Sequence, residues 1–167
     1  MKAGILAACL LGVQLALQRF LSRGRGHIVN VASSAGLVGV AGGATYSATK
    51  HGVVGFTRAL RAETRGTGVS TTVVMPGVVR TEMVEGFLSV RGTRIIEPSA
   101  VGNAIVKALQ TGRAEILVPP ELAPAARLAA GLSARGSDLL KRLLRADEVM
   151  GNADRSARDR YERRARP

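Results

Sequence analysis

The sequence predicts an α/β fold in which helices cover both faces of a parallel sheet, and three observations support this prediction. Helix-like and strand-like segments alternate through residues 1–120. Apolar residues make up 46% of the chain and aromatic residues only 3%, with 20 glycines, so closely packed Ala, Val and Leu must form the core. A length of 167 residues fits a single domain.

Glycine and proline separate the predicted elements. Glycine commonly follows the last turn of a helix, whereas proline fits a first helical turn and interrupts a strand. Alternation of helices and strands implies right-handed β-α-β crossovers. In chain order, we predict an apolar helix ending at Gly24 or Gly26, a strand over 27–33, a loop, a helix over 45–64, a strand over 69–75, an irregular segment over 78–96, a helix between Pro98 and Gly112, and a strand within 115–120.

The first predicted helix has a composition that also occurs in signal peptides. Lys2 is followed by sixteen residues without a charge. This run is short for a membrane span, and no A-x-A cleavage site follows it. We therefore favour a buried helix of the domain. Cys9 is the only cysteine, which excludes an internal disulfide and predicts a reducing, cytoplasmic location.

Residues 121–167 differ in character from the rest of the chain. Leucines lie among arginines and a charged tail follows, so we interpret 1–120 as the α/β unit and 121–167 as an amphipathic helical extension with a tail. A membrane-surface helix over 127–145 is an alternative. We favour leucines that cover a substrate pocket or contact a neighbouring subunit. The net charge of +12 is spread along the chain without interleaved aromatic residues, so nucleic-acid binding is not indicated.

Polar side chains gather at the predicted carboxyl ends of the strands, where parallel sheets bind ligands. Ser33 and Ser34 finish the first strand, and Tyr46 and Lys50 begin the helix that follows. Residues four apart share one helix face, so the phenol and the ammonium can point into the same cleft. A phenol ionises near pH 10, and a nearby ammonium favours its ionised form. This pair therefore predicts general acid–base chemistry at an alcohol or ketone.

Taken together, these motifs resemble a known family. GHIVNVASSAG, YSATKHGVVGFTRALRAE and VVMPGVVRTEM, with a thirteen-residue step from Ser33 to Tyr46, are similar to the carboxyl-terminal half of the short-chain dehydrogenase/reductase family. The resemblance covers about residues 15–119. It implies a partial Rossmann-like, doubly wound sheet of three strands. It also implies that Ser33, Tyr46 and Lys50 are catalytic, with Gly36 at the position of the family's glycine.

The resemblance further implies a nicotinamide cofactor, NAD or NADP, and reversible hydride transfer to or from a small hydrophobic alcohol or carbonyl substrate. Residues 84–96 correspond to a substrate loop. No metal is predicted, because His27 and His51 have no partners at ligand spacing. The implied cofactor-binding residues are Tyr46, Lys50, Pro76, Gly77, Val79 and Thr81.

Two features depart from the family pattern. No G-x-x-x-G-x-G turn precedes Ser33, and that turn would hold the adenosine and pyrophosphate. Ile5 stands where the family has a catalytic asparagine. A three-stranded sheet also leaves the first strand's outer edge unpaired, which invites association. The alternative interpretation is a truncated, catalytically incompetent module that acts by oligomeric association. In the family that the sequence resembles, these two helices commonly pack between subunits, so both interpretations predict a homo-oligomer through helices 2–22 and 45–64.

Overall fold

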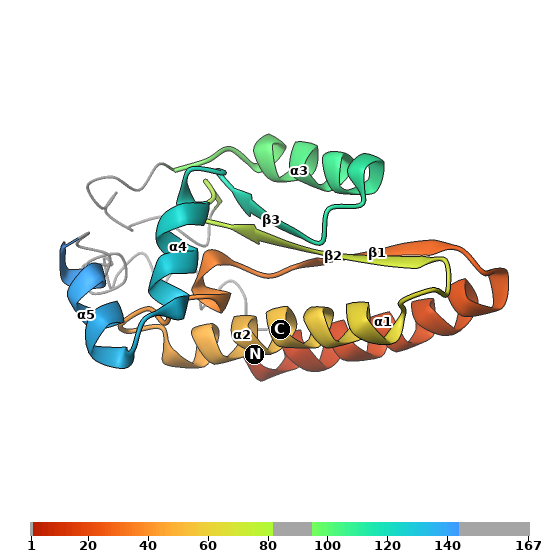
Figure 1. The fold of residues 1–167 in the computed structure, drawn as a ribbon, viewed down its shortest axis with the longest axis horizontal. Helices are drawn as coiled ribbons and strands as arrows, with labels where there is room; N and C mark the ends of the chain where they lie inside the picture. The colour runs from red at the N-terminus through yellow and green to blue at the C-terminus, as the bar shows by residue number, and fades with distance from the viewer. Residues whose placement is uncertain (1, 82–94, 144–167) are drawn as a thin grey trace.

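The computed structural model describes residues 2–81 and 95–143, and Figure 1 shows a sheet between two helical layers. The predicted fold class is confirmed, and every predicted helix and strand is present. Gly24 and Gly112, both at positive φ, follow the helices they were expected to end. The elements are α1 (Lys2–Arg23), β1 (Gly26–Val31), the 3₁₀ turn η1 (Ser34–Gly36), α2 (Ala44–Glu63), β2 (Val69–Pro76), α3 (Pro98–Thr111), β3 (Glu115–Val118), α4 (Leu122–Gly131) and α5 (Ala134–Leu143).

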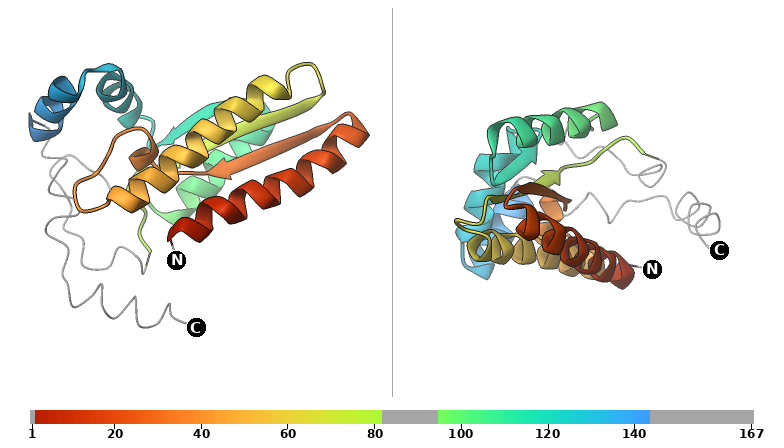
Figure 2. Two further views of the ribbon diagram at one scale, coloured as in Figure 1. Left: turned by 90° about the horizontal axis from the view of Figure 1, so that it is seen from below. Right: turned by 90° about the vertical axis from the view of Figure 1, so that its right-hand side faces the viewer.

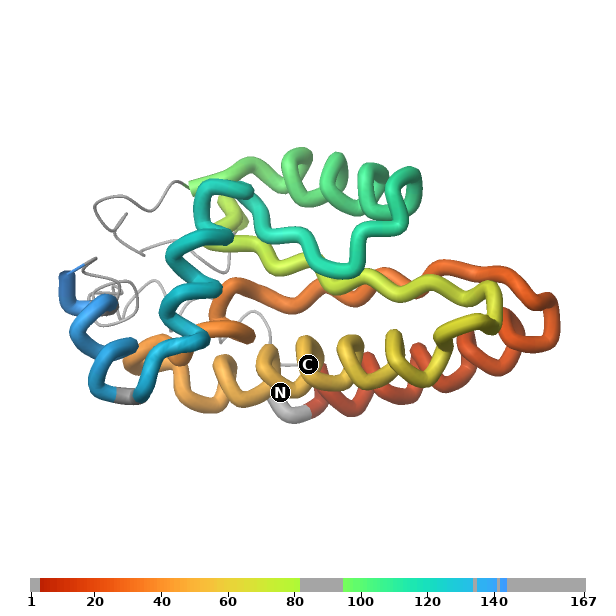
Figure 3. Tube along the Cα trace, in the orientation of Figure 1, coloured from red at the N-terminus to blue at the C-terminus, as the bar shows by residue number. Residues whose placement is uncertain are grey.

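The three strands are parallel and lie in the order β1-β2-β3. Gly26 pairs with Val69 and Val31 with Val74, while β3 pairs only with the second half of β2, from Val73 to Pro76. All three strands therefore end at one edge of the sheet, on the left in Figure 1. The turns at the right-hand end connect α1 to β1 and α2 to β2, as the tube in Figure 3 shows.

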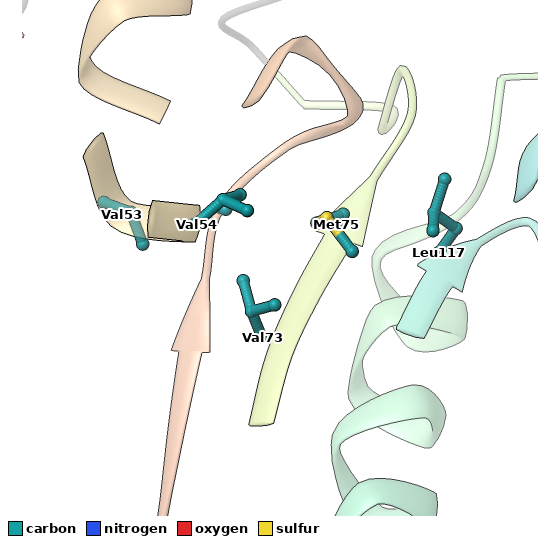
Figure 4. Close-up of a cluster of buried hydrophobic side chains, with 6 residues drawn as sticks. Val53, Val54, Val73, Met75 and Leu117 are labelled. Atoms are coloured by element: carbon teal, nitrogen blue, oxygen red, sulfur yellow. The ribbon is translucent and has the colours of Figure 1, made fainter. Parts of the chain in front are cut away.

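Helices α1 and α2 lie side by side on one face of the sheet, and α3 covers the other (Figure 2). Between α2 and the sheet, side chains from α2, β2 and β3 form a buried cluster (Figure 4). Full burial of each such side chain contributes about 1.5–3 kcal/mol. The residues labelled in this cluster are Val53, Val54, Val73, Met75 and Leu117.

Helix α1 forms as predicted, but the expectation that it is buried is wrong for most of its surface. One stripe, which includes Val13, packs against α2 and the sheet. The opposite stripe is exposed, with Leu11 at 62% and Leu15 at 68%. Among the described residues, Gly4–Arg23 is long and apolar enough to cross a membrane, with a mean hydropathy of 1.7, a property that core helices and signal sequences share.

The outer edge of β1 is unpaired within the described ranges, as a three-stranded sheet requires. Val31, near the end of this strand, is 44% exposed although it is β-branched and apolar. Near β3, at the opposite edge of the sheet, α4 packs through Leu122, Ala123 and Ala126 against the buried cluster between α2 and the sheet. Two helices thus follow β3, while residues 144–167 lie outside the described residues.

Candidate active site

The carboxyl ends of β1 and β2 bring the predicted site residues to one edge of the sheet. Ser33 follows β1, Tyr46 and Lys50 lie in the first turns of α2, Pro76 is the last paired residue of β2, and Gly77 follows it. Parallel strands leave this edge open to ligands because the connecting chain turns away from it. The sequence predicted this convergence correctly.

Ser33 joins the two strand ends. Its hydroxyl donates to the carbonyl oxygen of Pro76 at 3.4 Å and accepts from the backbone N–H of Ala35 at 3.2 Å, which caps the turn η1. The Ser33 side chain is well buried, with 8% of the residue exposed. A donor–acceptor distance of 3.4 Å is long for a hydroxyl bond. The hydroxyl is therefore weakly hydrogen-bonded and can donate to a better acceptor instead.

Gly36 lets the turn η1 approach α2 closely. A Cβ atom at this position would lie 2.6 Å from the carbonyl oxygen of Lys50 and 2.9 Å from a methyl group of Val54. Backbone atoms cannot yield as the end of a flexible side chain can. A residue without a side chain is therefore needed for Ser33 and the helix that carries Lys50 to lie against one another.

Tyr46 and Lys50 face one another on α2, as their spacing predicts. The ammonium nitrogen of Lys50 lies 5.7 Å from the centre of the Tyr46 ring, within the range of a cation–π interaction. The same nitrogen donates to the carbonyl oxygen of Val31 at 3.2 Å. Lys50 thus connects the start of α2 to the carboxyl end of β1, and Tyr46 lies beside it, half-buried.

Burial lowers the pKa of Lys50, because the partly buried ammonium loses hydration, and an electrostatic interaction with Cys9 opposes that shift. Burial likewise raises the pKa of the Cys9 thiol, and Lys50 opposes this shift. Cys9 on α1 therefore belongs to the surroundings of Lys50. The sequence analysis used it only as an indicator of compartment.

The side chain of Asn30 on β1 connects this strand to α1 and α2. The role of Asn30 was not predicted from the sequence. Its side chain accepts from the Cys9 thiol at 3.5 Å and donates to the Thr57 hydroxyl at 2.9 Å. Thr57 in turn donates to the carbonyl oxygen of Val53 at 2.7 Å. A buried polar residue within the apolar strand run HIVNV was the available signal, since such residues require partners.

The segment that follows β2 pairs with the segment that precedes α3. Val79 pairs with Ile96, and the exposed side chains of Arg80 and Glu97 form an ion pair at 2.7 Å. Thr81 is exposed, and its hydroxyl donates to the carbonyl oxygen of Val79 at a long distance of 3.4 Å. Of the predicted substrate loop 84–96, residues 84–94 lie outside the described residues.

Comparison with known proteins gives one consistent result. A family model described as short chain dehydrogenase matches residues 5–90, more than half of the chain. The ketoacyl reductase HetN of Nostoc sp. is 41% identical over 108 residues, which cover 63% of this chain and 38% of that protein. A monensin polyketide synthase putative ketoacyl reductase of Streptomyces virginiae is 56% identical over 64 residues, 38% of this chain and 24% of that protein.

Solved structures show the same fold. A short-chain dehydrogenase/reductase from Burkholderia phymatum in complex with NAD gives a TM-score of 0.61 at 25% identity, covering 71% of this chain and 52% of that one. A 4-hydroxyisoleucine dehydrogenase complexed with NADH gives 0.59 at 24% identity, covering 66% and 52%. The chain thus spans about half the length of these structures and 38% of the Nostoc reductase. The family model and the shared fold establish that this chain belongs to the short-chain dehydrogenase family.

Proposed function

We propose that this chain carries the catalytic residues of an NAD(P)-dependent oxidoreductase that interconverts a ketone and an alcohol. The observation that carries the proposal is the placement of Lys50 against both Tyr46 and the end of β1, with Ser33 on the neighbouring strand end. A phenol, a cation and a weakly held hydroxyl at one open edge suit proton transfer to a carbonyl oxygen.

In the reducing direction, a nicotinamide held at this edge would supply the hydride that the carbonyl carbon takes up. Tyr46 gives its phenolic proton to the carbonyl oxygen, and the alcohol forms. Ser33 exchanges its long bond to Pro76 for one to that same oxygen and so holds it against the phenol. Lys50 stabilises the phenolate left behind, because its ammonium lies near the ring, and solvent then returns a proton to Tyr46.

The residues at this edge fit the nicotinamide–ribose end of the cofactor. An ammonium has three donors, and Lys50 directs one toward Val31, so two can reach ribose hydroxyls. Thr81 is exposed and weakly bonded, which suits a contact to the carboxamide or a phosphate. Pro76 ends β2, Gly77 and Val79 follow it, and these three residues would line the nicotinamide.

For the substrate, we propose a ketoacyl compound or a similar hydrophobic ketone. The relatives from Nostoc sp. and Streptomyces virginiae are both named as ketoacyl reductases. Helix α4 begins beside Gly77, where a Cβ atom would lie 2.9 Å from the Leu122 side chain. Exposed Leu128 and Leu139 add apolar surface on α4 and α5. These helices would contact an acyl chain bound next to the nicotinamide.

The second candidate function is association without catalysis. Two observations favour it, namely the exposed leucine stripe of α1 and the unpaired outer edge of β1. The α1 stripe is apolar, whereas the β1 edge presents backbone N–H and C=O groups that are unpaired within the described residues, and a second chain would cover both. Cofactor binding distinguishes the candidates, because an association module has no need of it.

The test is a fluorescence titration of the 167-residue chain with NADH and, separately, NADPH. Wild type is expected to give a saturable signal, Lys50→Met a much weaker one, and Lys107→Met, on the exposed face of α3, an unchanged one. Tyr46→Phe is expected to bind cofactor but to lose ketone reduction. No saturation at millimolar concentrations of either cofactor would reject the oxidoreductase and favour association.

A further inference from the structure

A second candidate site lies at the end of the sheet remote from Tyr46. A half-open pocket with a cavity volume of about 470 Å³ forms between the end of α2, the start of β2 and Gly112. A further cavity of about 610 Å³, next to Arg23 and Arg25, lies at the same end. In Figure 1 this is the right-hand end, whereas the proposed active site is at the left. Tyr46 and Arg61 are fifteen positions apart on α2, which corresponds to about 22 Å.

Three arginines line this pocket: Arg58 and Arg61 in the last turns of α2, and Arg65 in the turn that follows the helix. Arg58 and Arg61 are three residues apart and therefore share one face of α2. Arg58 is held by Glu115 on β3 through two bonds, at 2.7 and 3.1 Å. Within the described part of the chain, Arg61 and Arg65 form no ion pair. Arg61 interacts electrostatically with Glu115 but is not paired with it, so both guanidinium groups can still contact an anion.

The pocket wall also contains an uncharged hydrogen-bond donor, the hydroxyl of Thr71. Thr71 lines the pocket, is only 4% exposed, and its hydroxyl has no hydrogen-bond partner among residues 2–81 and 95–143. Such a buried hydroxyl is costly unless a ligand or solvent satisfies it. The strand β3 pairs with β2 only from Val73 onward, so the β3-facing backbone edge of Ser70 and Thr71 extends beyond it into the pocket wall.

We propose that this pocket binds the phosphate group of a small soluble phosphorylated molecule. Two guanidinium forks match a phosphate dianion in charge and in geometry, and the Thr71 hydroxyl gives one further donor. The volume fits a small molecule. The carboxyl end of α2 contributes partial negative charge, which opposes anion binding. Binding therefore depends on Arg61 and Arg65, and the helix terminus cannot replace them.

The first test measures the unfolding temperature of the chain with increasing inorganic pyrophosphate, at ionic strength held constant with sodium chloride. Wild type is expected to be stabilised saturably. The double variant Arg61→Ala/Arg65→Ala is expected to lose this response, whereas Arg19→Ala/Arg142→Ala, which removes the same charge from α1 and α5, keeps it. Equal responses in all three proteins, or equal losses in both double variants, would overturn the proposal.

Thr71→Val tests the hydroxyl separately, because it keeps the shape of the side chain. The variant is expected to have a higher unfolding temperature without ligand, since an unpartnered buried hydroxyl is removed. Its affinity for pyrophosphate should fall by about tenfold, the value of one hydrogen bond to a charged group. Unchanged affinity would exclude Thr71 from the site. Titrations with adenosine 5′-monophosphate and glycerol 3-phosphate then distinguish a nucleotide from a simple phosphomonoester, and failure of all three probes overturns the proposal.

Discussion

The ammonium nitrogen of Lys50 lies 5.7 Å from the centre of the Tyr46 ring and donates to the carbonyl oxygen of Val31. One cation thus contacts its own helix and the neighbouring strand end. The arrangement has a cost, because burial of the ammonium lowers the pKa of Lys50. Lys50 is therefore expected to support catalysis at the expense of stability.

Lys50→Met separates these two effects. When the pKa of a lysine is lower in the folded state, the fold becomes less stable as pH falls below the pKa of the unfolded chain, about 10.4. That loss of stability is present at neutral pH. Removing the charge is expected to raise the urea midpoint at neutral pH, by an amount that shrinks as pH rises toward about 10.4. Lys107→Met, on the exposed face of α3, serves as the control. A lower midpoint for Lys50→Met at neutral pH would show that the ammonium stabilises the fold.

Ser33 and Ser34 form a matched pair for the proposed catalytic hydroxyl. The Ser33 hydroxyl contacts Pro76 and Ala35, whereas the backbone carbonyl of Ser34 accepts from Leu37 and Val38 and, within the described ranges, its hydroxyl takes part in no hydrogen bond. Ser33→Ala is expected to reduce turnover on the order of a hundredfold, as for the loss of one transition-state donor. Ser34→Ala should retain turnover. Ketone reduction followed by cofactor absorbance checks both, and equal effects would contradict the assignment.

Gly36→Ala is expected to damage the site through the backbone. The new methyl group would lie 2.6 Å from the carbonyl oxygen of Lys50, so the turn η1 must move away from α2. Overpacking of this kind costs about 1–3 kcal/mol, and Ser33 would be displaced with the turn. Gly39→Ala is the control, because no atom lies within 4 Å of a Cβ at that position. Urea unfolding and turnover of the two variants should differ clearly, and similar values would argue against a tight contact.

The elements could be predicted from sequence because glycine and proline mark their ends and the strands consist of β-branched runs. Pro98 and Gly112 bound α3 as expected, and the Tyr46–Lys50 spacing on one helix face required only helical geometry. By contrast, the burial of α1 could not be predicted. Apolar composition shows that a helix can be buried, but not whether other parts of this chain pack against all of its apolar surface.

The finer parts of the site depend on contacts between distant residues. Nothing local to Gly36 indicates that the backbone of Lys50 lies against it, and nothing local to Cys9 indicates Asn30 or Lys50. The arginine pocket was also not expected, since Glu115 pairs with Arg58 across 57 positions and, within the described residues, Arg61 and Arg65 form no ion pair. Contacts of this kind form only when folding brings residues from distant helices and strands together.

The exposed stripe of α1 predicts self-association. Leu11 and Leu15 are four residues apart on one face and together expose a large apolar surface. Leu11→Arg/Leu15→Glu is expected to shift the chain toward monomer, as measured by analytical ultracentrifugation. The control is Gln14→Glu/Gln18→Arg, which places the same charges on exposed polar positions of α1 and should leave the oligomer intact. A monomeric wild-type chain would contradict the prediction.

His27 gives the fold a pH dependence at the end of the sheet remote from the active site. The Thr72 hydroxyl donates to the carbonyl oxygen of Arg113 at 2.6 Å, so it accepts from Nε2 of His27, 2.8 Å away. Burial lowers the pKa of His27. The unfolded chain therefore takes up its proton first, near pH 6.5, and stability declines as pH falls below that value.

His27→Gln keeps a donor for Thr72 but cannot take up a proton. The variant is expected to lose less stability than wild type between about pH 7.5 and about pH 5.5, measured as the urea midpoint. His51→Gln, at an exposed position of α2, should follow wild type. The carboxylate of Glu115 does not interfere, because Arg58 holds its pKa low and its contribution is lost only at more acidic pH. If wild type and His27→Gln declined in parallel, the histidine would not be the titrating group.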